Sequence, residues 1–141
     1  MNTFNITIIG TGYVGAVTGA CFAELGHNIT FVGRDQKKLD LISSGKSPIY
    51  EPGLDDLLAK NQDRISTTTD LVGAVKRTDL TFICVGTPSQ DDGSIDLRQV
   101  EDVSSVIGSA IRSSPDYHTI VVKSTVLPGT TEDLLLPILE K

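Results

Sequence analysis

A glycine-rich segment near the amino terminus places the strongest constraint on the fold of this chain. Gly10, Gly12 and Gly15 form the pattern G-x-G-x-x-G. The pattern follows a β-branched run at 6–9 that is typical of a buried strand, and it opens a helical pattern over 13–25. In that context the three glycines permit a tight turn, close approach of the backbone to a pyrophosphate, and close packing of helix on strand. The segment therefore predicts a dinucleotide-binding loop, with a purely structural glycine turn as the alternative.

Strand-like and helix-like segments alternate along the whole chain. We expect strands at 6–9, 29–32, 64–67, 80–85 and 119–122, and helices at 13–25, 36–43, 54–60, 70–76, 97–112 and 131–140. This alternation implies right-handed βαβ units on a parallel sheet. The predicted fold class is α/β, a Rossmann-like doubly wound parallel sheet with helices on both faces. The length of the chain predicts one domain over residues 1–141, and the glycine loop makes it a dinucleotide-binding domain.

The first helix carries four apolar side chains at helical spacing: Val14, Val17, Cys21 and Leu25. We expect this stripe to face the core, with Cys21 as a small buried hydrophobe. Gly19 is expected to let the helix lie close to the sheet. Cys84, inside the predicted strand 80–85, is likewise expected in the core. The segment from Glu51 to Leu54 is expected to form a structural turn.

Charge and cysteine content argue against several classes of protein. Twelve basic and eighteen acidic residues give a net charge of −6, which argues against a nucleic-acid partner because phosphate binding needs clustered Lys and Arg. No apolar run has the length of a membrane span, and the first residues lack signal-peptide features. Two cysteines and two histidines favour a reduced, cytoplasmic protein without a metal site.

Polar or glycine-rich segments follow four of the predicted strands, at 10–15, 33–35, 86–88 and 124–125. The carboxyl ends of parallel strands meet at one edge, where ligands bind in open α/β sheets. Thr87 and Thr125 each offer a hydroxyl donor and acceptor for a nicotinamide ring or a catalytic water, and Pro88 stiffens the first of these loops. The alternative for Thr87 is that its hydroxyl caps its own backbone.

The end of the second strand lacks the acidic residue that usually binds the adenosine ribose. The expected position, about 20 residues beyond the glycine loop, is Gly33, followed by Arg34 and Asp35, with Lys38 one turn later. A missing carboxylate beside two cations favours NADP or a relaxed choice of cofactor. Two alternatives stay open: Arg34 and Lys38 are only solvated, or Asp35 reaches the ribose.

Four motifs occur in order: Gly10-Thr-Gly-Tyr-Val-Gly15, Ser47-Pro-Ile-Tyr-Glu-Pro-Gly-Leu54, Val85-Gly-Thr-Pro88 and Ser124-Thr-Val-Leu-Pro-Gly129. The set resembles the N-terminal NAD-binding domain of the UDP-glucose/GDP-mannose dehydrogenase family, most closely its UDP-glucose 6-dehydrogenases. The resemblance implies oxidation of the C6 hydroxyl of UDP-glucose to UDP-glucuronate, in polysaccharide biosynthesis, by two hydride transfers to NAD. By position it places the Val14 backbone at the pyrophosphate, Lys38 near the ribose, and Thr87 and Thr125 beside the nicotinamide.

The cofactor-binding set taken from these patterns is Gly10, Gly12, Tyr13, Val14, Gly15, Arg34, Lys38, Thr87, Pro88 and Thr125. Thr125 is also the one catalytic candidate. The resemblance implies that a catalytic Cys and Lys belong to substrate-binding and C-terminal domains outside this chain. We therefore expect the chain alone to bind cofactor without turnover, and the full-length enzyme to be a homodimer acting on a nucleotide sugar.

Other functions compete with this interpretation. A GDP-mannose or UDP-N-acetylmannosamine 6-dehydrogenase domain fits the same motifs, although Tyr50 favours UDP-glucose. A free-standing NAD(P)-sensing module shares the glycine loop but not the threonine loops at 85–88 and 124–129. A methyltransferase is a third option, because its glycine loop holds a cofactor without a pyrophosphate.

Overall fold

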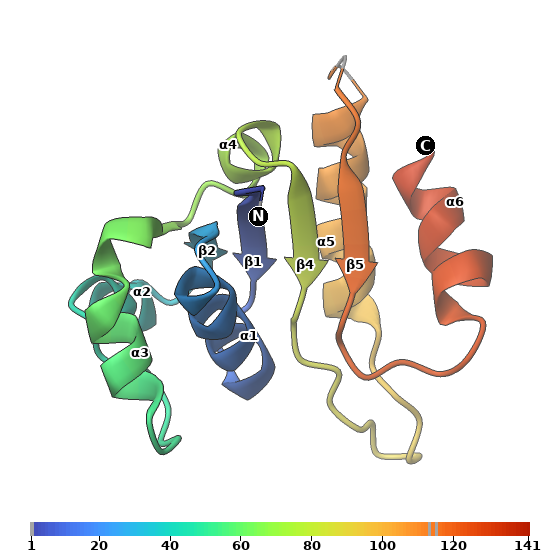
Figure 1. The fold of residues 1–141 in the computed structure, drawn as a ribbon. Helices are drawn as coiled ribbons and strands as arrows, with labels where there is room; N and C mark the ends of the chain where they lie inside the picture. Colours follow the sequence, from blue (N-terminus) through green and yellow to red (C-terminus); the bar gives the residue numbers. More distant parts are fainter. Residues whose placement is uncertain (1, 113, 115) are drawn as a thin grey trace.

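The computed structural model describes residues 2–112, 114 and 116–141. Within these ranges, five parallel strands form a sheet in the order β3-β2-β1-β4-β5 (Figure 1). The strands are β1 (Asn5–Ile9), β2 (Asn28–Val32), β3 (Ile65–Thr68), β4 (Leu80–Ile83) and β5 (Thr119–Val122). The chain winds outward from β1 in one direction and then, from β4, in the other. The predicted doubly wound α/β fold is thus confirmed, with its switch point between β1 and β4.

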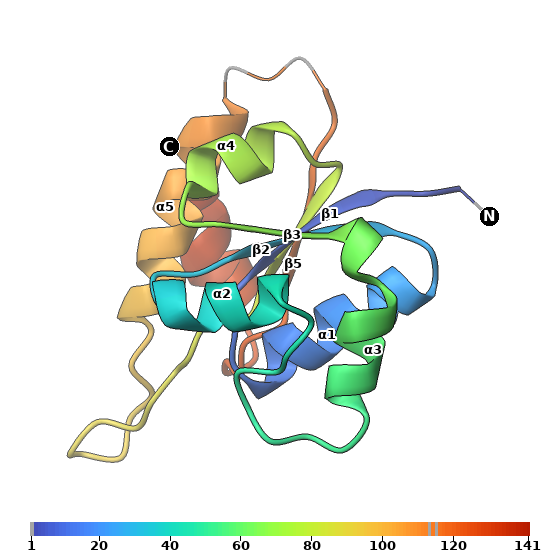
Figure 2. The same ribbon diagram turned by 90° about the vertical axis from the view of Figure 1, so that its left-hand side faces the viewer.

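Helices cover both faces of the sheet (Figure 2). One face is covered by α1 (Tyr13–Glu24), α2 (Gln36–Ser43) and α3 (Leu54–Lys60), and the 3-10 turn η1 (Gln62–Arg64) leads into β3. The other face is covered by α4 (Leu71–Lys76), α5 (Arg98–Ile111) and the π-helical segment η2 (Thr130–Leu135), which continues into α6 (Leu136–Leu139). Each face buries its own hydrophobic cluster, so the sheet is a fully covered central layer.

Helix α1 packs on the sheet mainly through its smallest residues, and of the four residues in the predicted apolar stripe Val17 packs partly against the core. Its buried positions are Gly15, Ala16, Gly19, Ala20 and Ala23. A Cβ atom on Gly19 would overlap the ring of Phe31, so the helix axis lies unusually close to β2, as expected for Gly19. Cys21 is exposed, and Leu25 is 59% exposed. The prediction of a buried Cys21 was wrong, because close approach of the helix selects glycine and alanine for the contact and Cys21 lies outside it. Cys84 is buried as predicted.

Local hydrogen bonds and backbone conformation account for the starts of α4 and α3, which agree with the predictions. The Asp70 carboxylate accepts a 2.9 Å hydrogen bond from the Gly73 N–H and starts α4. The predicted turn before α3 is present: the Leu54 N–H donates to the Glu51 carbonyl at 3.1 Å, and Gly53 supplies a φ of +81°.

Two segment ends differ from prediction. Strand β4 stops at Ile83 rather than Val85, because the Ser124 hydroxyl donates to the Val85 carbonyl at 2.7 Å in place of a strand partner. The predicted helix 131–140 is π-helical up to Leu135. Pro137 has no N–H to donate four residues back, so the preceding turn cannot close in the α-helical pattern.

Candidate functional site

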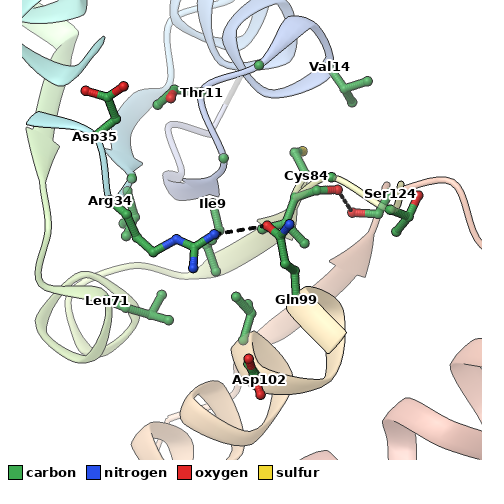
Figure 3. A pocket seen from close by; sticks show the side chains of 18 of the residues that line it. Ile9, Thr11, Val14, Arg34, Asp35, Leu71, Cys84, Gln99, Asp102 and Ser124 are labelled. Atoms are coloured by element: carbon green, nitrogen blue, oxygen red, sulfur yellow. Dashed lines mark hydrogen bonds between the residues drawn. The ribbon is translucent and has the colours of Figure 1, made fainter. Parts of the chain in front are cut away.

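A cavity of about 640 Å³ opens at the carboxyl edge of the sheet, over the switch point (Figure 3). The strands end in register there, with Ile9 opposite both Val32 and Ile83. As a result the loops after β1, β2, β4 and β5 all reach the cavity, and one side of α5 closes it. This is the position at which open α/β sheets bind their ligands.

Each of the three glycines in the first loop stands at its position for a different physical reason. Gly10 has a φ of +107°, and a Cβ on it would overlap the Cys84 carbonyl. A Cβ on Gly15 would overlap the carbonyl of Gly10. Gly12 has no neighbouring atom within 4 Å of a Cβ position. Packing within the protein therefore requires Gly10 and Gly15, whereas at Gly12 the open space faces the cavity.

Gly12 is also the N-cap residue of α1, and no side chain caps this helix end. The first N–H groups of an α-helix have no partner within the helix. In α1 these N–H groups include those of Tyr13 and Val14, and both residues line the cavity. Free N–H groups and the positive end of the helix dipole make this a place for a phosphate group. The structure thus holds what a pyrophosphate needs, and the open face at Gly12 lets it approach.

The end of β2 brings Arg34, Asp35 and Lys38 to the same cavity. Asp35 turns one carboxylate oxygen back onto the start of α2, where its Oδ1 accepts hydrogen bonds from the N–H groups of Lys37 at 3.0 Å and Lys38 at 3.4 Å. It is the N-cap of α2. Arg34 instead crosses the cavity, and its Nη2 donates to Oε1 of Gln99 on α5 at 3.2 Å (Figure 3).

The loops after β4 and β5 are joined at the opposite end of the cavity. The Thr87 hydroxyl donates to the Thr125 carbonyl at 2.8 Å, so it does not cap its own backbone. The Ser124 hydroxyl is buried and bridges to the Val85 carbonyl. Both loops are therefore fixed relative to one another, with Thr87 and Thr125 on the cavity wall.

The cavity wall includes most of the predicted cofactor set: Gly10, Gly12, Tyr13, Val14, Arg34, Lys38, Thr87 and Thr125. Gly15 and Pro88 are not part of it. Gly15 packs under the loop against Gly10. The Pro88 carbonyl accepts a 2.8 Å hydrogen bond from the Asp96 N–H, which holds the base of the loop 89–95. These two residues shape the site from outside its wall.

The sequence reasoning missed the contribution of α5, whose wall residues are Gln99, Asp102, Val103 and Val106. A signal was present in the helix pattern: Val100, Ser104 and Ile107 form its buried face, and Val103 and Val106 lie beside that face. An apolar flank next to a core face indicates a surface that another group covers.

Cys84 also lines the cavity but is not set up as a nucleophile. Its burial raises the pKa of the thiol to about 11, against a smaller opposite effect of the Lys123 charge. The thiol therefore stays protonated at neutral pH, and the thiolate is the reactive form.

Comparisons with known proteins place this site in a family. The family model described as "UDP-glucose/GDP-mannose dehydrogenase family, NAD binding domain" matches residues 4–141. The chain belongs to this family. A GDP-mannose 6-dehydrogenase from Pseudomonas aeruginosa is 49% identical over 137 residues, which are 96% of this chain and 31% of that protein.

Solved structures from the UDP-glucose/GDP-mannose dehydrogenase family have the same fold. A ternary complex of GDP-mannose dehydrogenase from Pseudomonas aeruginosa superimposes with a TM-score of 0.93 at 49% identity, covering 96% of this chain and 31% of that one. A UDP-glucose dehydrogenase from Pyrobaculum islandicum gives a TM-score of 0.91 at 41% identity, covering 98% and 32%. The chain thus spans about a third of the length of these relatives.

The residues that the structure describes contain no helix long and apolar enough to cross a membrane. In the same ranges, no three His, Cys, Asp or Glu side chains gather in a way that could hold a metal ion.

Proposed function

We propose that this chain is the cofactor-binding domain of a nucleotide-sugar 6-dehydrogenase, an enzyme that oxidises the C6 alcohol of the sugar to a carboxylate. One observation carries the proposal. A single cavity joins an uncapped helix N-terminus with open space at Gly12 to two linked threonine loops. The first end suits a pyrophosphate, and the second suits a nicotinamide ring. Family membership supports this function over a free-standing sensing module or a methyltransferase.

In this function the residues of the chain bind and orient. The N–H groups at the start of α1 would hold the pyrophosphate, and the loops of Thr87 and Thr125, which line the other end of the cavity, would hold the nicotinamide ring. A nicotinamide dinucleotide bound here supplies the hydride acceptor. Thr125 lines the cavity, and its hydroxyl is the group of this chain that we place beside the reacting atoms, where it holds the ring or a catalytic water.

We infer that the substrate is GDP-mannose rather than the UDP-glucose favoured by the sequence motifs. The Pseudomonas GDP-mannose 6-dehydrogenase is 49% identical, whereas the Pyrobaculum UDP-glucose dehydrogenase is 41% identical. Tyr50, on which the UDP-glucose expectation leaned, is 86% exposed and makes no part of the cavity wall. UDP-glucose is the second candidate. We place the Cys and Lys of the reaction, and the homodimer contacts, in the portion of the enzyme beyond this domain.

Titration of the 141-residue chain with NADH, followed by nicotinamide fluorescence, tests the function. We expect saturable binding that Gly12→Val abolishes, because the valine side chain fills the open space where the pyrophosphate approaches. The melting temperature of the variant should match the parent chain, since nothing lies within 4 Å of the added Cβ. Unchanged NADH binding by Gly12→Val, or no binding by the parent chain, would overturn the proposal.

A further inference from the structure

The adenosine end of the cavity lacks a carboxylate at the position from which one usually accepts hydrogen bonds from the ribose hydroxyls. At the end of β2, the position that usually carries this carboxylate is Gly33. The next acidic residue, Asp35, caps α2 through its Oδ1. In Figure 3 its carboxylate points away from the Arg34 guanidinium. The usual basis for preferring an unphosphorylated ribose is therefore missing.

Two cations line this end instead. Arg34 follows Gly33 directly, and Lys38 lies in the first turn of α2; both line the cavity. In the part of the chain that the structure describes, the two ion pairs are Lys60–Glu24 and Arg98–Asp96. Among the described residues, therefore, no carboxylate forms an ion pair with Arg34 or Lys38.

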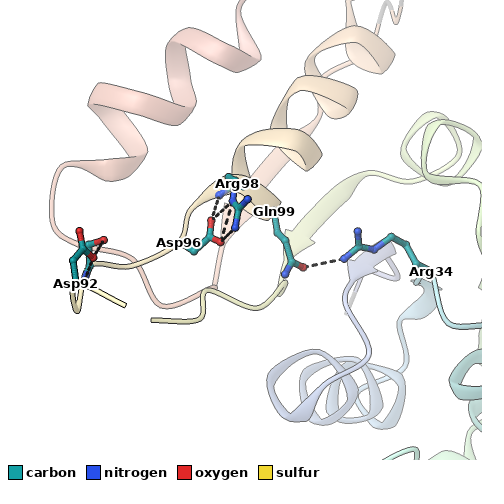
Figure 4. Close-up of polar contacts among 6 residues, drawn as sticks. Arg34, Asp92, Asp96, Arg98 and Gln99 are labelled. Atoms are coloured by element: carbon teal, nitrogen blue, oxygen red, sulfur yellow. Dashed lines mark hydrogen bonds and ion pairs between the residues drawn. The ribbon is translucent and has the colours of Figure 1, made fainter. Parts of the chain in front are cut away.

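The partner of Arg34 is a neutral amide. Its Nη2 donates to Oε1 of Gln99 at 3.2 Å, which fixes the guanidinium across the cavity and leaves its other donors available. The neighbouring Arg98 is paired with Asp96 on the side of α5 away from this contact (Figure 4). An amide holds the guanidinium in place without cancelling its charge. An anion can therefore bind Arg34 without first breaking an ion pair.

The acidic residues of the cavity wall are Asp35 and Asp102. Asp35 caps α2 through its Oδ1, and Asp102 lies one turn beyond Gln99, below the Arg34–Gln99 contact in Figure 3. Neither carboxylate forms an ion pair with Arg34. A guanidinium fork binds phosphate oxygens in a bidentate manner, and an ammonium one turn away adds a second charge.

We propose that Arg34 and Lys38, with Gln99 holding Arg34 in position, form a binding site for the 2′-phosphate of an adenosine nucleotide. The domain therefore binds NADP in preference to NAD. This inference rests on the proposed function, since it names the cofactor class of the same cavity. Gln99 is a positioning residue here, whereas Arg34 and Lys38 contact the phosphate.

Two probes that differ only in the 2′-phosphate test the site. The 141-residue chain is titrated calorimetrically, at 0.15 M salt, with adenosine 2′,5′-bisphosphate and with adenosine 5′-monophosphate. We expect the bisphosphate to bind at least about tenfold more tightly, because a charge-assisted hydrogen bond contributes more than a neutral one. Equal or weaker binding of the bisphosphate would overturn the inference.

Variants separate the phosphate contact from general charge. Arg34→Met and Lys38→Met should each reduce bisphosphate affinity about tenfold or more while leaving monophosphate affinity within about twofold. Lys37→Met is the matched control: it removes the same charge from the same helix, but Lys37 does not line the cavity. Equal losses in Lys37→Met and Lys38→Met would mean long-range attraction rather than a built site.

Gln99→Leu tests the positioning role. It should weaken bisphosphate binding less than Arg34→Met does, and Gln99→Glu should weaken it more than Gln99→Leu because a carboxylate would pair with the guanidinium. If the parent chain bound none of the bisphosphate, the monophosphate and NADH, that result would count against the proposed function. NADH and monophosphate binding without a bisphosphate preference would refute only the 2′-phosphate site.

Discussion

The side-chain hydroxyl of Thr87 donates a hydrogen bond to the backbone carbonyl of Thr125 at 2.8 Å. The two residues are 38 positions apart and follow neighbouring strands, β4 and β5. The contact joins two loops that line one end of the cavity. A backbone carbonyl cannot be changed by substitution, so the donor at Thr87 is the half of this contact that mutagenesis can address.

Thr87→Val removes the hydroxyl and keeps the shape of the side chain. We expect the free energy of unfolding to fall by about 1 kcal/mol or less, because the contact is exposed and a net hydrogen bond contributes about that much. NADH affinity should fall about threefold to tenfold, because the two loops lose their fixed spacing. Thr87→Ser retains the donor and should restore affinity in the same fluorescence titration. If Thr87→Val bound NADH as tightly as Thr87→Ser, the link would have no role in binding.

Gly19→Ala should destabilise the domain through the contact between α1 and β2. The new Cβ overlaps the buried Phe31 ring, so helix and sheet must separate or the ring must shift. Overpacking of this kind costs about 1–3 kcal/mol. Urea denaturation measures the loss, and Gly12→Ala is the control, since its Cβ meets no atom. Adding Phe31→Leu to Gly19→Ala should recover part of the loss, because residues in contact do not behave additively.

The two cysteines should differ in their reaction with iodoacetamide. In the folded chain at pH 8 we expect alkylation of the exposed Cys21 and protection of the buried Cys84, measured by peptide mass spectrometry. In urea both should react. Alkylation of Cys84 in the folded chain at a rate near that of Cys21 would contradict the burial seen here.

Burial of Cys84 also predicts a dependence of stability on pH. The pKa of its thiol is raised to about 11 from 9.0. Between these values the unfolded chain loses the thiol proton while the folded chain keeps it. The contribution of the Cys84 thiol to the free energy of unfolding is therefore fully present below pH 9 and is lost as the pH rises toward 11. The difference in unfolding free energy between the parent chain and Cys84→Ala should shrink over this range. A constant difference would contradict the raised pKa.

How far the sequence predicts this molecule depends on the kind of local signal. The start of α4 follows from the Asp70 side chain, which accepts a hydrogen bond from a nearby backbone N–H, and the turn into α3 follows from Gly53, which adopts a positive φ. Both signals can be seen in neighbouring residues of the sequence. The buried face of α1 did not follow. Glycine and alanine make up its buried positions, and the proximity of the Phe31 ring explains why a residue without a side chain is needed at Gly19. That proximity is a tertiary contact between α1 and β2, which the local sequence of α1 does not show.

The candidate site shows the same division. The loops after the strands were predictable because parallel strands bring their carboxyl ends to one edge. Gln99 was not predictable, because α5 begins after a long polar loop and only the folded chain brings its first turn within 3.2 Å of Arg34. Sequence alone left the role of Arg34 open between a solvated charge and a phosphate ligand.

Gly33→Asp should reverse the cofactor preference that we infer from Arg34 and Lys38. An aspartate there provides the carboxylate that accepts hydrogen bonds from the ribose hydroxyls of NAD and repels a 2′-phosphate. The backbone at Gly33 does not have a positive φ, and a Cβ would lie 3.3 Å from Thr11 Cγ2 and 3.4 Å from Leu39 Cδ2, two side chains that can move slightly. We expect the ratio of NADP to NAD affinity to fall at least about tenfold. Gly33→Asn adds similar volume without charge and should change the ratio less. If both variants changed the ratio equally, the effect would come from crowding against Thr11 and Leu39, and the charge at this position would not select the cofactor.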